Sequence, residues 1–115
     1  MDLIKLTDED YKDRIASIPG GLVLIHKKLC PHCLNMTKVI EKFLAARGEN
    51  DLLPVMGLDS EENPKALEEL SIERVPTLLV VKNGKVVAKR MGLMNPRELA
   101  AFYTDSHNQE SRREV

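Results

Sequence analysis

Several residue types and patterns are scarce in this sequence, and each absence excludes a class of protein. Tryptophan is absent and aromatic residues make up 3% of the 115 residues, which argues against a base-stacking surface for single-stranded nucleic acids. Basic and acidic residues number 17 and 18 and are scattered, so no strongly basic face for DNA, RNA or anionic lipid is expected. No apolar stretch approaches the roughly 18 residues of a membrane span.

The N-terminal residues carry no visible secretion signal. They turn acidic at Asp8, Glu9 and Asp10, where a signal peptide would have its apolar stretch, and no cleavage site follows. We therefore expect a cytoplasmic protein. A chain of 115 residues fits one compact domain with its own core. In a reducing cytosol, a pair of cysteines is more often catalytic or metal-binding than structural.

The apolar pattern of the chain predicts alternating strands and helices. Helices are expected from a cap at residue 7 or 8 to the Pro-Gly-Gly at 19–21, from residue 30 to near 48, from residue 63, and from 95 to 103. Strands are expected at residues 3–6, 22–25, 52–58, 77–81 and 85–89, and Asn83-Gly84 joins the last two as a hairpin.

This order of elements predicts an α/β fold, with a central mixed β-sheet and helices on both faces. Helical crossovers make the earlier strands parallel, and the hairpin adds an antiparallel edge. We expect a single domain over residues 1–103 and a polar, frayed tail over 104–115. The only two cysteines follow the apolar run 22–25, and so lie at the carboxyl end of a central strand, where open α/β sheets place their sites.

The two cysteines stand three residues apart in Cys30-Pro31-His32-Cys33. Such a pair between a buried strand and a helix is typical of a dithiol that cycles between thiol and disulfide. At the helix start Cys30 should be exposed, and the free N–H groups and helix dipole should lower the pKa of its thiol below about 8.5. Cys33 should be more buried and keep its proton. We therefore expect Cys30 to attack a substrate disulfide and Cys33 to resolve the mixed disulfide.

The residues around this pair should tune its reduction potential. His32 within the turn, and Lys27 and Lys28 just before it, add hydrogen-bond donors or positive charge. A better stabilised Cys30 thiolate makes the disulfide more oxidising. Pro31 and His32 therefore predict a potential above that of an ordinary reductant, although His32 could also be a simple exposed helix residue.

Two other roles for the cysteines stay open, namely a structural clip and half of a zinc or cluster site. Zinc needs four ligands, and only His26, His32 and the distant His107 could supplement the two sulfurs. Disulfide exchange needs no bound group, so we expect neither a cofactor nor a metal.

The chain resembles the thioredoxin family from Leu22 to about Tyr103. The resemblance is carried by the C-x-x-C site together with Val75-Pro76-Thr77, the apolar run and Asn-Gly that follow it, and Gly92 beyond the last strand.

This resemblance implies the thioredoxin fold and the activity of a thiol-disulfide oxidoreductase. It implies that Pro76 is cis and packs beside the disulfide, and that Val75, Pro76 and Gly92 shape a groove. In that groove the Val75 backbone pairs with an extended substrate segment. It also implies electrons from a thioredoxin-reductase-like flavoprotein.

The departures from the family concern the interior of the site. Leu29 stands in place of the family's Trp, and Pro-His is the dipeptide of the periplasmic disulfide oxidases. The family's buried Asp, which accepts the proton of the second cysteine, aligns with Leu24, and its Lys partner falls near residues 55–57, where there is no Lys. Cys33 must then lose its proton by another route, through water, His26 or His32. The sequence is most similar to the Cys-Pro-His-Cys thioredoxins called desulfothioredoxins.

We therefore predict a monomeric thiol-disulfide oxidoreductase that reduces or exchanges disulfides of cytoplasmic proteins through Cys30 and Cys33. One alternative, suggested by the Pro-His dipeptide, is a net disulfide oxidase or isomerase. Another is a non-redox metal or cluster carrier that uses the same thiolates. Leu29 is a candidate for contact with partners or for simple packing, and His26 is a candidate for proton transfer.

Overall fold

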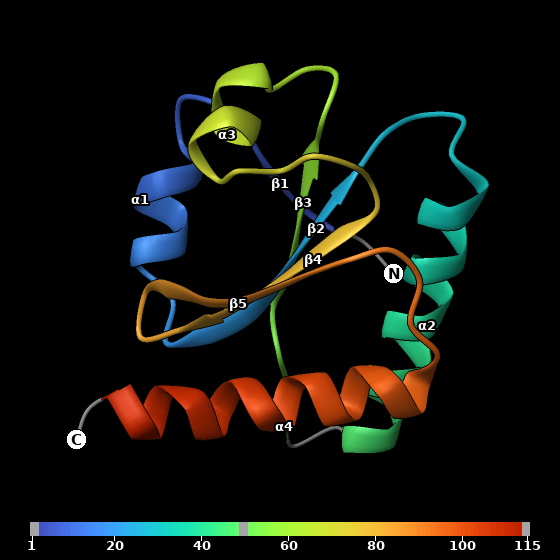
Figure 1. The fold of residues 1–115 in the computed structure, drawn as a ribbon, viewed down its shortest axis with the longest axis vertical. Helices are drawn as coiled ribbons and strands as arrows, with labels where there is room; N and C mark the ends of the chain where they lie inside the picture. The colour runs from blue at the N-terminus through green and yellow to red at the C-terminus, as the bar shows by residue number, and fades with distance from the viewer. Residues whose placement is uncertain (1–2, 49–50, 114–115) are drawn as a thin grey trace.

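The computed structural model describes residues 3–48 and 51–113, with side chains as far as residue 106. The elements follow the predicted order (Figure 1). They are β1 (Ile4–Leu6), α1 (Tyr11–Ala16), β2 (Gly20–His26), α2 (Pro31–Arg47), β3 (Val55–Asp59), α3 (Pro64–Glu69), β4 (Thr77–Lys82), β5 (Lys85–Met91) and α4 (Pro96–Arg113).

One mixed sheet of five strands forms the centre of the molecule, in the order β1-β3-β2-β4-β5. Strands β1, β3 and β2 are parallel, while β4 and β5 are antiparallel to their neighbours. Helices α1 and α3 cover one face of the sheet, and α2 and α4 cover the other (Figure 1). The predicted α/β fold with helices on both faces is therefore confirmed.

The central strand β2 contributes to two apolar cores because its side chains alternate between the faces. Leu22 and Leu24 belong to the core shared with α2 and α4. Val23 and Ile25 belong to the core shared with α1 and α3. Each of the four is at most 1% exposed, and burying such a side chain contributes about 1.5–3 kcal/mol. The end of β2, which leads to the cysteines, is thereby held firmly in place.

The hairpin between β4 and β5 forms at the predicted residues. Asn83 and Gly84 have positive φ angles of 51° and 74°, which a tight two-residue hairpin turn requires and which Asn and Gly adopt at low cost. The turn also meets the end of α1, since Gly84 N–H donates to the Ile18 carbonyl at 2.9 Å.

Thr7, one of the two predicted caps, does cap the turn that leads into α1. Its hydroxyl accepts from the Asp10 N–H at 3.2 Å, and the Asp10 carboxylate accepts from the Thr7 N–H at 2.8 Å. The helix α1 itself begins later, at Tyr11. Its N-cap is Asp10, whose side chain makes no capping hydrogen bond to the helix. The Asp8 carboxylate instead accepts from the Ala66 N–H at 2.7 Å, at the start of α3. The capping chemistry of Asp8 therefore serves a helix that is distant in the sequence, which the local pattern could not indicate.

Two strand boundaries also differ from the prediction. Gly20 and Gly21 open β2 and do not simply end the preceding helix. A Cβ at Gly21 would lie 2.9 Å from the Pro54 carbonyl oxygen, so glycine allows the close approach of the chain that leads into β3. That strand begins at Val55, and the apolar Leu52, which the prediction placed in it, is exposed.

The last helix extends beyond Tyr103, where the prediction ended it and expected a frayed tail. Helix α4 continues to Arg113. Ser106 is buried, and its hydroxyl donates to the Phe102 carbonyl at 2.7 Å. A polar residue can thus continue the buried face of a helix when its own backbone accepts the hydroxyl. None of the described helices is both long and apolar enough to span a bilayer.

Candidate active site

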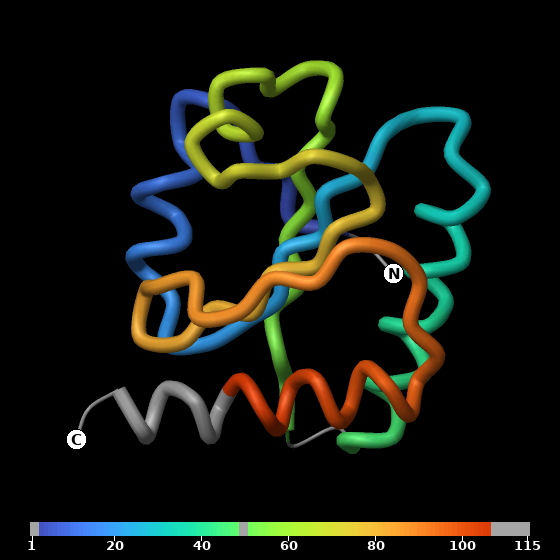
Figure 2. The backbone as a smooth tube through the Cα atoms, in the orientation of Figure 1, coloured from blue at the N-terminus to red at the C-terminus, as the bar shows by residue number. Residues whose placement is uncertain are grey.

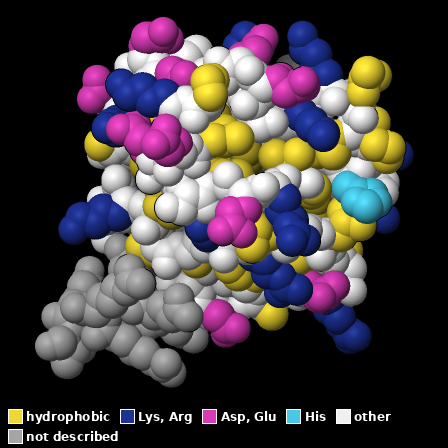
Figure 3. Space-filling model, turned by 45° about the horizontal axis from the view of Figure 1, so that its top comes forward, with side chains coloured by type: hydrophobic (Ala, Val, Ile, Leu, Met, Phe, Trp, Pro, Cys, Tyr) yellow, Lys and Arg dark blue, Asp and Glu magenta, His cyan; other side chains and the backbone are white. Residues whose placement is uncertain are grey.

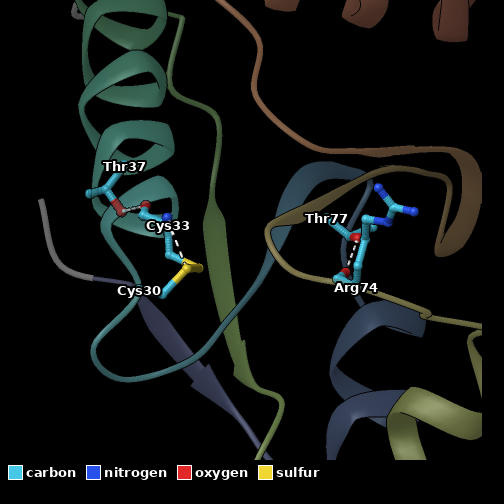
Figure 4. The surroundings of a disulfide bond; sticks show 5 residues. All are labelled: Cys30, Cys33, Thr37, Arg74 and Thr77. Carbon is cyan, nitrogen blue, oxygen red and sulfur yellow. Dashed lines mark hydrogen bonds between the residues drawn. A yellow bond between two sulfur atoms is a disulfide. The ribbon is translucent and has the colours of Figure 1, made fainter.

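The cysteine pair lies between the end of β2 and the first turn of α2. Cys30 and Cys33 form a disulfide with a Cα–Cα distance of 5.2 Å (Figure 4), within the usual range for this bond. Cys30 is the N-cap of α2 and Pro31 is its first residue. Proline suits this position because its missing N–H has no helical partner to lose.

The sulfur of Cys30 lies at the positive end of α2. The Cys33 N–H is 3.2 Å from Cys30 Sγ and donates to it. The Cys30 carbonyl in turn accepts from Cys33 N–H at 3.1 Å and Leu34 N–H at 3.2 Å, which starts the helix. An N–H group and a helix N-terminus both favour negative charge on a sulfur. The site is thus arranged to stabilise a Cys30 thiolate when the disulfide opens.

The two cysteines differ less in exposure than the sequence predicted. Cys33 is 4% exposed and Cys30 is 9% exposed, so Cys30 is the more accessible residue by a small margin only. The reason is that the Cys30 sulfur is directed back over the first turn, toward Cys33. The two residues between them, Pro31 and His32, are both exposed.

Leu29 is fully exposed and has an unusual backbone conformation. Its relative exposure is 100% and its φ is 55°, a region that costs a non-glycine residue roughly 1–2 kcal/mol. Leu34, one turn into α2, is 66% exposed. Simple packing therefore does not account for Leu29, and the disulfide has apolar side chains open to solvent beside it. Figure 3 shows hydrophobic side chains exposed among charged ones of both signs.

The loop before β4 lies at the same end of the sheet as the backbone segment that joins β2 to α2 and carries the cysteines (Figure 2). The Val75–Pro76 peptide bond is cis, as the resemblance implies. Pro76 is buried and Val75 is half-buried. Gly92 N–H donates to the Pro76 carbonyl at 2.8 Å. The three residues expected to shape a groove are thus joined to one another.

Thr77 holds this loop, a role that sequence reasoning missed. Its side chain is completely buried, and its hydroxyl donates to the Arg74 carbonyl at 2.6 Å (Figure 4). Thr77 also pairs with Ile25 of β2, next to the segment that carries the cysteines. A polar residue at the start of an otherwise apolar strand was the available signal.

His26 and both cysteines border one hollow of about 180 Å³. His26 is the last residue of β2 and is half-buried. His32 does not line this hollow. The lining residues are Leu3, His26, Lys27, Lys28, Leu29, Cys30, Cys33, Leu34 and Thr37.

Gly57 provides the space in which His26 lies, and this was also missed. The sequence pattern treated Gly57 as a weakness of its strand, whereas it is buried within β3 opposite Leu24. A Cβ at Gly57 would lie 2.8 Å from Leu3 Cδ1 and 3.1 Å from His26 Nε2. No side chain other than hydrogen fits there without displacing them. Leu24 itself is 1% exposed, so neither of these two paired positions carries a carboxylate or an amine. The amine at this level of the sheet is that of Lys5 in β1, which pairs with Gly57.

The described residues contain no group of three or more His, Cys, Asp or Glu side chains placed to hold a metal ion. His107, considered above as a zinc ligand, lies outside the described side chains.

Comparison with known proteins places the chain in a family. It matches the family model described as Thioredoxin over residues 2–105. The thioredoxin of Staphylococcus aureus is 32% identical over 110 residues, which cover 93% of this chain and 99% of that protein.

Two solved structures are similar in fold. The solution structure of desulfothioredoxin from Desulfovibrio vulgaris Hildenborough in its reduced form has a TM-score of 0.77 and 42% identity, and covers 91% of this chain and 99% of that one. A chain from a structure on the thiol resolving mechanism in yeast mitochondrial 1-Cys peroxiredoxin has a TM-score of 0.76. At 22% identity, with 90% of this chain and 95% of that one covered, it shows the fold alone.

The predicted resemblance is thereby confirmed, and the five-stranded sheet with its helices is the thioredoxin fold. The disulfide at the start of α2 provides the reactive group that such a fold carries. This chain therefore belongs to the thioredoxin family and is a thiol-disulfide oxidoreductase.

Proposed function

We propose that the protein reduces or exchanges disulfide bonds of other proteins in two steps. The Cys30 thiolate attacks a substrate disulfide, one substrate sulfur leaves as a thiol, and a mixed disulfide remains. Cys33 then attacks Cys30 Sγ, releases the second substrate thiol and closes the Cys30–Cys33 disulfide. The observation that carries this proposal is the place of Cys30 as the N-cap of α2, with the Cys33 N–H 3.2 Å from its sulfur.

The same geometry supports a raised reduction potential. Stabilising the Cys30 thiolate lowers the pKa of this thiol and favours the dithiol over the disulfide. Pro31 and His32 are the tuning residues, since both are exposed in the turn that joins the cysteines. We expect a potential above the about −270 mV of thioredoxin, in the direction of the about −120 mV of the strong periplasmic oxidase.

A net oxidase or isomerase is the second candidate, and the N-cap position of Cys30 favours it as well. A more oxidising disulfide gives its oxidising equivalents to substrates more readily. The reduction potential of the Cys30–Cys33 pair, and the direction in which it exchanges with a protein thiol, would distinguish a reductase from a net oxidase or isomerase.

Substrate proteins would bind beside the disulfide. Leu29 and Leu34 offer exposed apolar contacts there, and exposed apolar surface of this kind often serves binding. The Val75 backbone, next to Pro76 and Gly92, would pair with an extended substrate segment. Substrates of this class are proteins that present a disulfide in a flexible or extended segment.

The proposed partners follow from membership of the family. A thioredoxin-reductase-like flavoprotein would return the protein to its dithiol form. We propose a cytoplasmic monomer that needs no bound cofactor, because the two sulfurs carry both electrons of the exchange.

Replacing each cysteine tests the proposed function. The variant C30S should lose disulfide exchange, because no nucleophile remains at the helix start. The variant C33S should accumulate mixed disulfides with substrate, detectable by mass under non-reducing conditions. A C33S variant that turned over as fast as the wild type would overturn the two-cysteine mechanism. Stoichiometric zinc or iron on the anaerobically purified protein, lost in both variants, would favour a metal carrier instead.

A further inference from the structure

We propose that His26 accepts the proton that Cys33 loses when it attacks the mixed disulfide, and that His26 passes this proton to solvent. The inference rests on the two-step exchange proposed above and assigns a residue to its second step. The first observation is the shared hollow of about 180 Å³, which is lined by His26 and by both cysteines.

Cys33 needs such a partner because of its surroundings. It is 4% exposed, and burial away from charge disfavours a thiolate. The hollow beside it contains no carboxylate. Besides the cysteines, its ionisable members are His26, Lys27 and Lys28. Lysine is ordinarily protonated at neutral pH and cannot accept a proton, whereas imidazole ordinarily exchanges protons in that range.

The position of His26 is built into the sheet. As the last residue of β2 it lies opposite Asp59 of β3. Its Nε2 lies over Gly57, 3.1 Å from the place of a Cβ there, beside Leu3. Leu24 lies two residues before His26 on the same strand face and belongs to the core beneath α2. His26 is therefore directed to the face of the sheet that carries Cys33, and is held there by its neighbours.

His26 also borders a second hollow, of about 340 Å³, which shares Leu3, His26 and Lys28 with the first and is lined by Gly57 as well. Its charged members are Lys5 of β1, Lys28, Asp59 of β3, and Glu62 from the segment before α3. These groups, with Lys27, are the charges that surround the imidazole. Lys5, Lys28 and Glu62 are exposed, whereas Asp59 is buried, so a proton taken from Cys33 can leave to water through this second hollow.

The proposed step balances in protons and electrons. The Cys33 thiol gives its proton to neutral His26, directly or through water, for which the hollow has room. The Cys33 sulfur then forms a bond to Cys30 Sγ while the bond between Cys30 and the substrate sulfur breaks. The departing substrate thiolate takes a proton from solvent, and imidazolium returns its proton to solvent. The dithiol has lost two electrons and the substrate disulfide has gained them.

The test separates the two steps with a chromogenic aromatic disulfide, dithiobis-nitrobenzoate, added to the reduced protein. Attack by Cys30 releases the first coloured thiolate, and attack by Cys33 releases the second. In H26N, which keeps the size and hydrogen bonding of the side chain without its basicity, we expect the second phase to slow about 100-fold or more. The first phase should change less than about twofold, since His26 has no part in it.

The pH profile distinguishes proton transfer from a structural effect. In the wild type the second phase should rise with pH and then level off once the acceptor is neutral, because a protonated acceptor cannot take the Cys33 proton. In H26N this levelling off should be absent, and the rate should rise continuously with pH as Cys33 ionises by itself. The variant H26D, which restores a base, should recover part of the rate at neutral pH.

H32N is the matched control, because it removes the other described histidine of the site, which does not line the hollow. It should alter the first phase and leave the shape of the second-phase profile unchanged. The proposal is overturned if H26N has the wild-type second phase. It is also overturned if the wild-type second phase never levels off with pH, a measurement that needs no variant. Loss of the first phase in the wild type would instead contradict the proposed function.

Discussion

The α1–α3 contact and the start of α2 differ in where they place polar and apolar side chains. Where α1 meets α3, polar side chains are buried and saturated with hydrogen bonds. Around the start of α2, an apolar side chain is left in water on a strained backbone, and two cysteines carry the only disulfide among the described residues. The contrast separates a region that holds the fold together from one that acts on partners.

Asn63 is the centre of the hydrogen-bonded region. It is 4% exposed. Its amide donates to the Asp59 carbonyl at 2.9 Å and accepts from the Asp8 N–H at 2.8 Å. Asp8 in turn accepts from the Ala66 N–H. The N-terminal segment, the end of β3 and the start of α3 are thereby locked to one another, which explains why Asp8 does not cap its own helix.

Tyr11 and Glu69 complete this region by joining α1 to α3. The Tyr11 hydroxyl donates to the Glu69 carboxylate. Burial, followed by this bond, raises the pKa of Tyr11 to about 12. The bonds from Tyr11 and then from Lys12 hold the pKa of Glu69 below its ordinary value. Each partner thus keeps the protonation state that the hydrogen bond requires.

Replacement of Cys30 by Ser should give the largest effect. It compares the loss of disulfide exchange with the change in stability. We expect C30S to lose disulfide exchange to the level of the uncatalysed reaction, while the reduced variant unfolds in urea within about 1 kcal/mol of the reduced wild type. The measurement pairs an exchange assay with denaturant unfolding, both under reducing conditions. Large destabilisation of C30S would mean that the redox end also supports the fold.

Asn63→Ala should have the converse effect. Leaving the Asp8 N–H and Asp59 carbonyl without their buried partner should lower the free energy of unfolding by about 1–3 kcal/mol. The rate of disulfide exchange should stay within about twofold, because Asn63 itself lines neither of the hollows that His26 borders. Urea unfolding monitored by circular dichroism checks the first statement. An exchange rate that fell in proportion to stability would break the separation of the two regions.

Leu29→Asn should affect stability and function in opposite directions. Asparagine tolerates a positive φ better than leucine, so the variant should be unchanged or more stable by up to about 1 kcal/mol. Loss of the apolar contact should raise KM for a protein disulfide several-fold while a small disulfide reacts as before. The conservative control L29M should keep the KM of the wild type. Equal loss on both substrates would contradict a role in protein binding.

The Tyr11–Glu69 pair should give the smallest effect, visible as a pH dependence of stability. A raised pKa means that the folded state holds the Tyr11 proton more tightly than the unfolded state. The stabilisation of the fold by Tyr11 is therefore complete below pH 10 and is lost as the pH rises to about 12. The pKa of Glu69 is lowered in the fold, so its stabilisation of the fold is present above pH 4.5, the ordinary value, and is lost at more acid pH. Thermal unfolding should show Y11F losing the alkaline limb and keeping a weakened acid limb, because the Lys12 bond to Glu69 remains. The control K85Q, at the hairpin, should keep both limbs.

Prediction from the sequence succeeded where the signal was local. The positions of α2 and of the β4–β5 hairpin follow from Pro31, the apolar period behind it and Asn83-Gly84. It failed where a distant segment decides the outcome. Asp8 has the residue type of a cap but serves another helix, and Gly57 resembles a strand breaker until Leu3 and His26 are seen to fill its space. Neither partner is near in the sequence.

The sequence by itself determined the family, the order of elements and the pair of sulfurs, because periodicity, turn residues and the spacing of Cys30 and Cys33 are properties of neighbours along the chain. Only the tertiary structure decided which other groups face those sulfurs. It brought His26 to the hollow beside Cys33, left His32 in solvent and exposed Leu29 completely. Burial and proton transfer depend on distances between separate strands and helices, and these exist only once the sheet has formed.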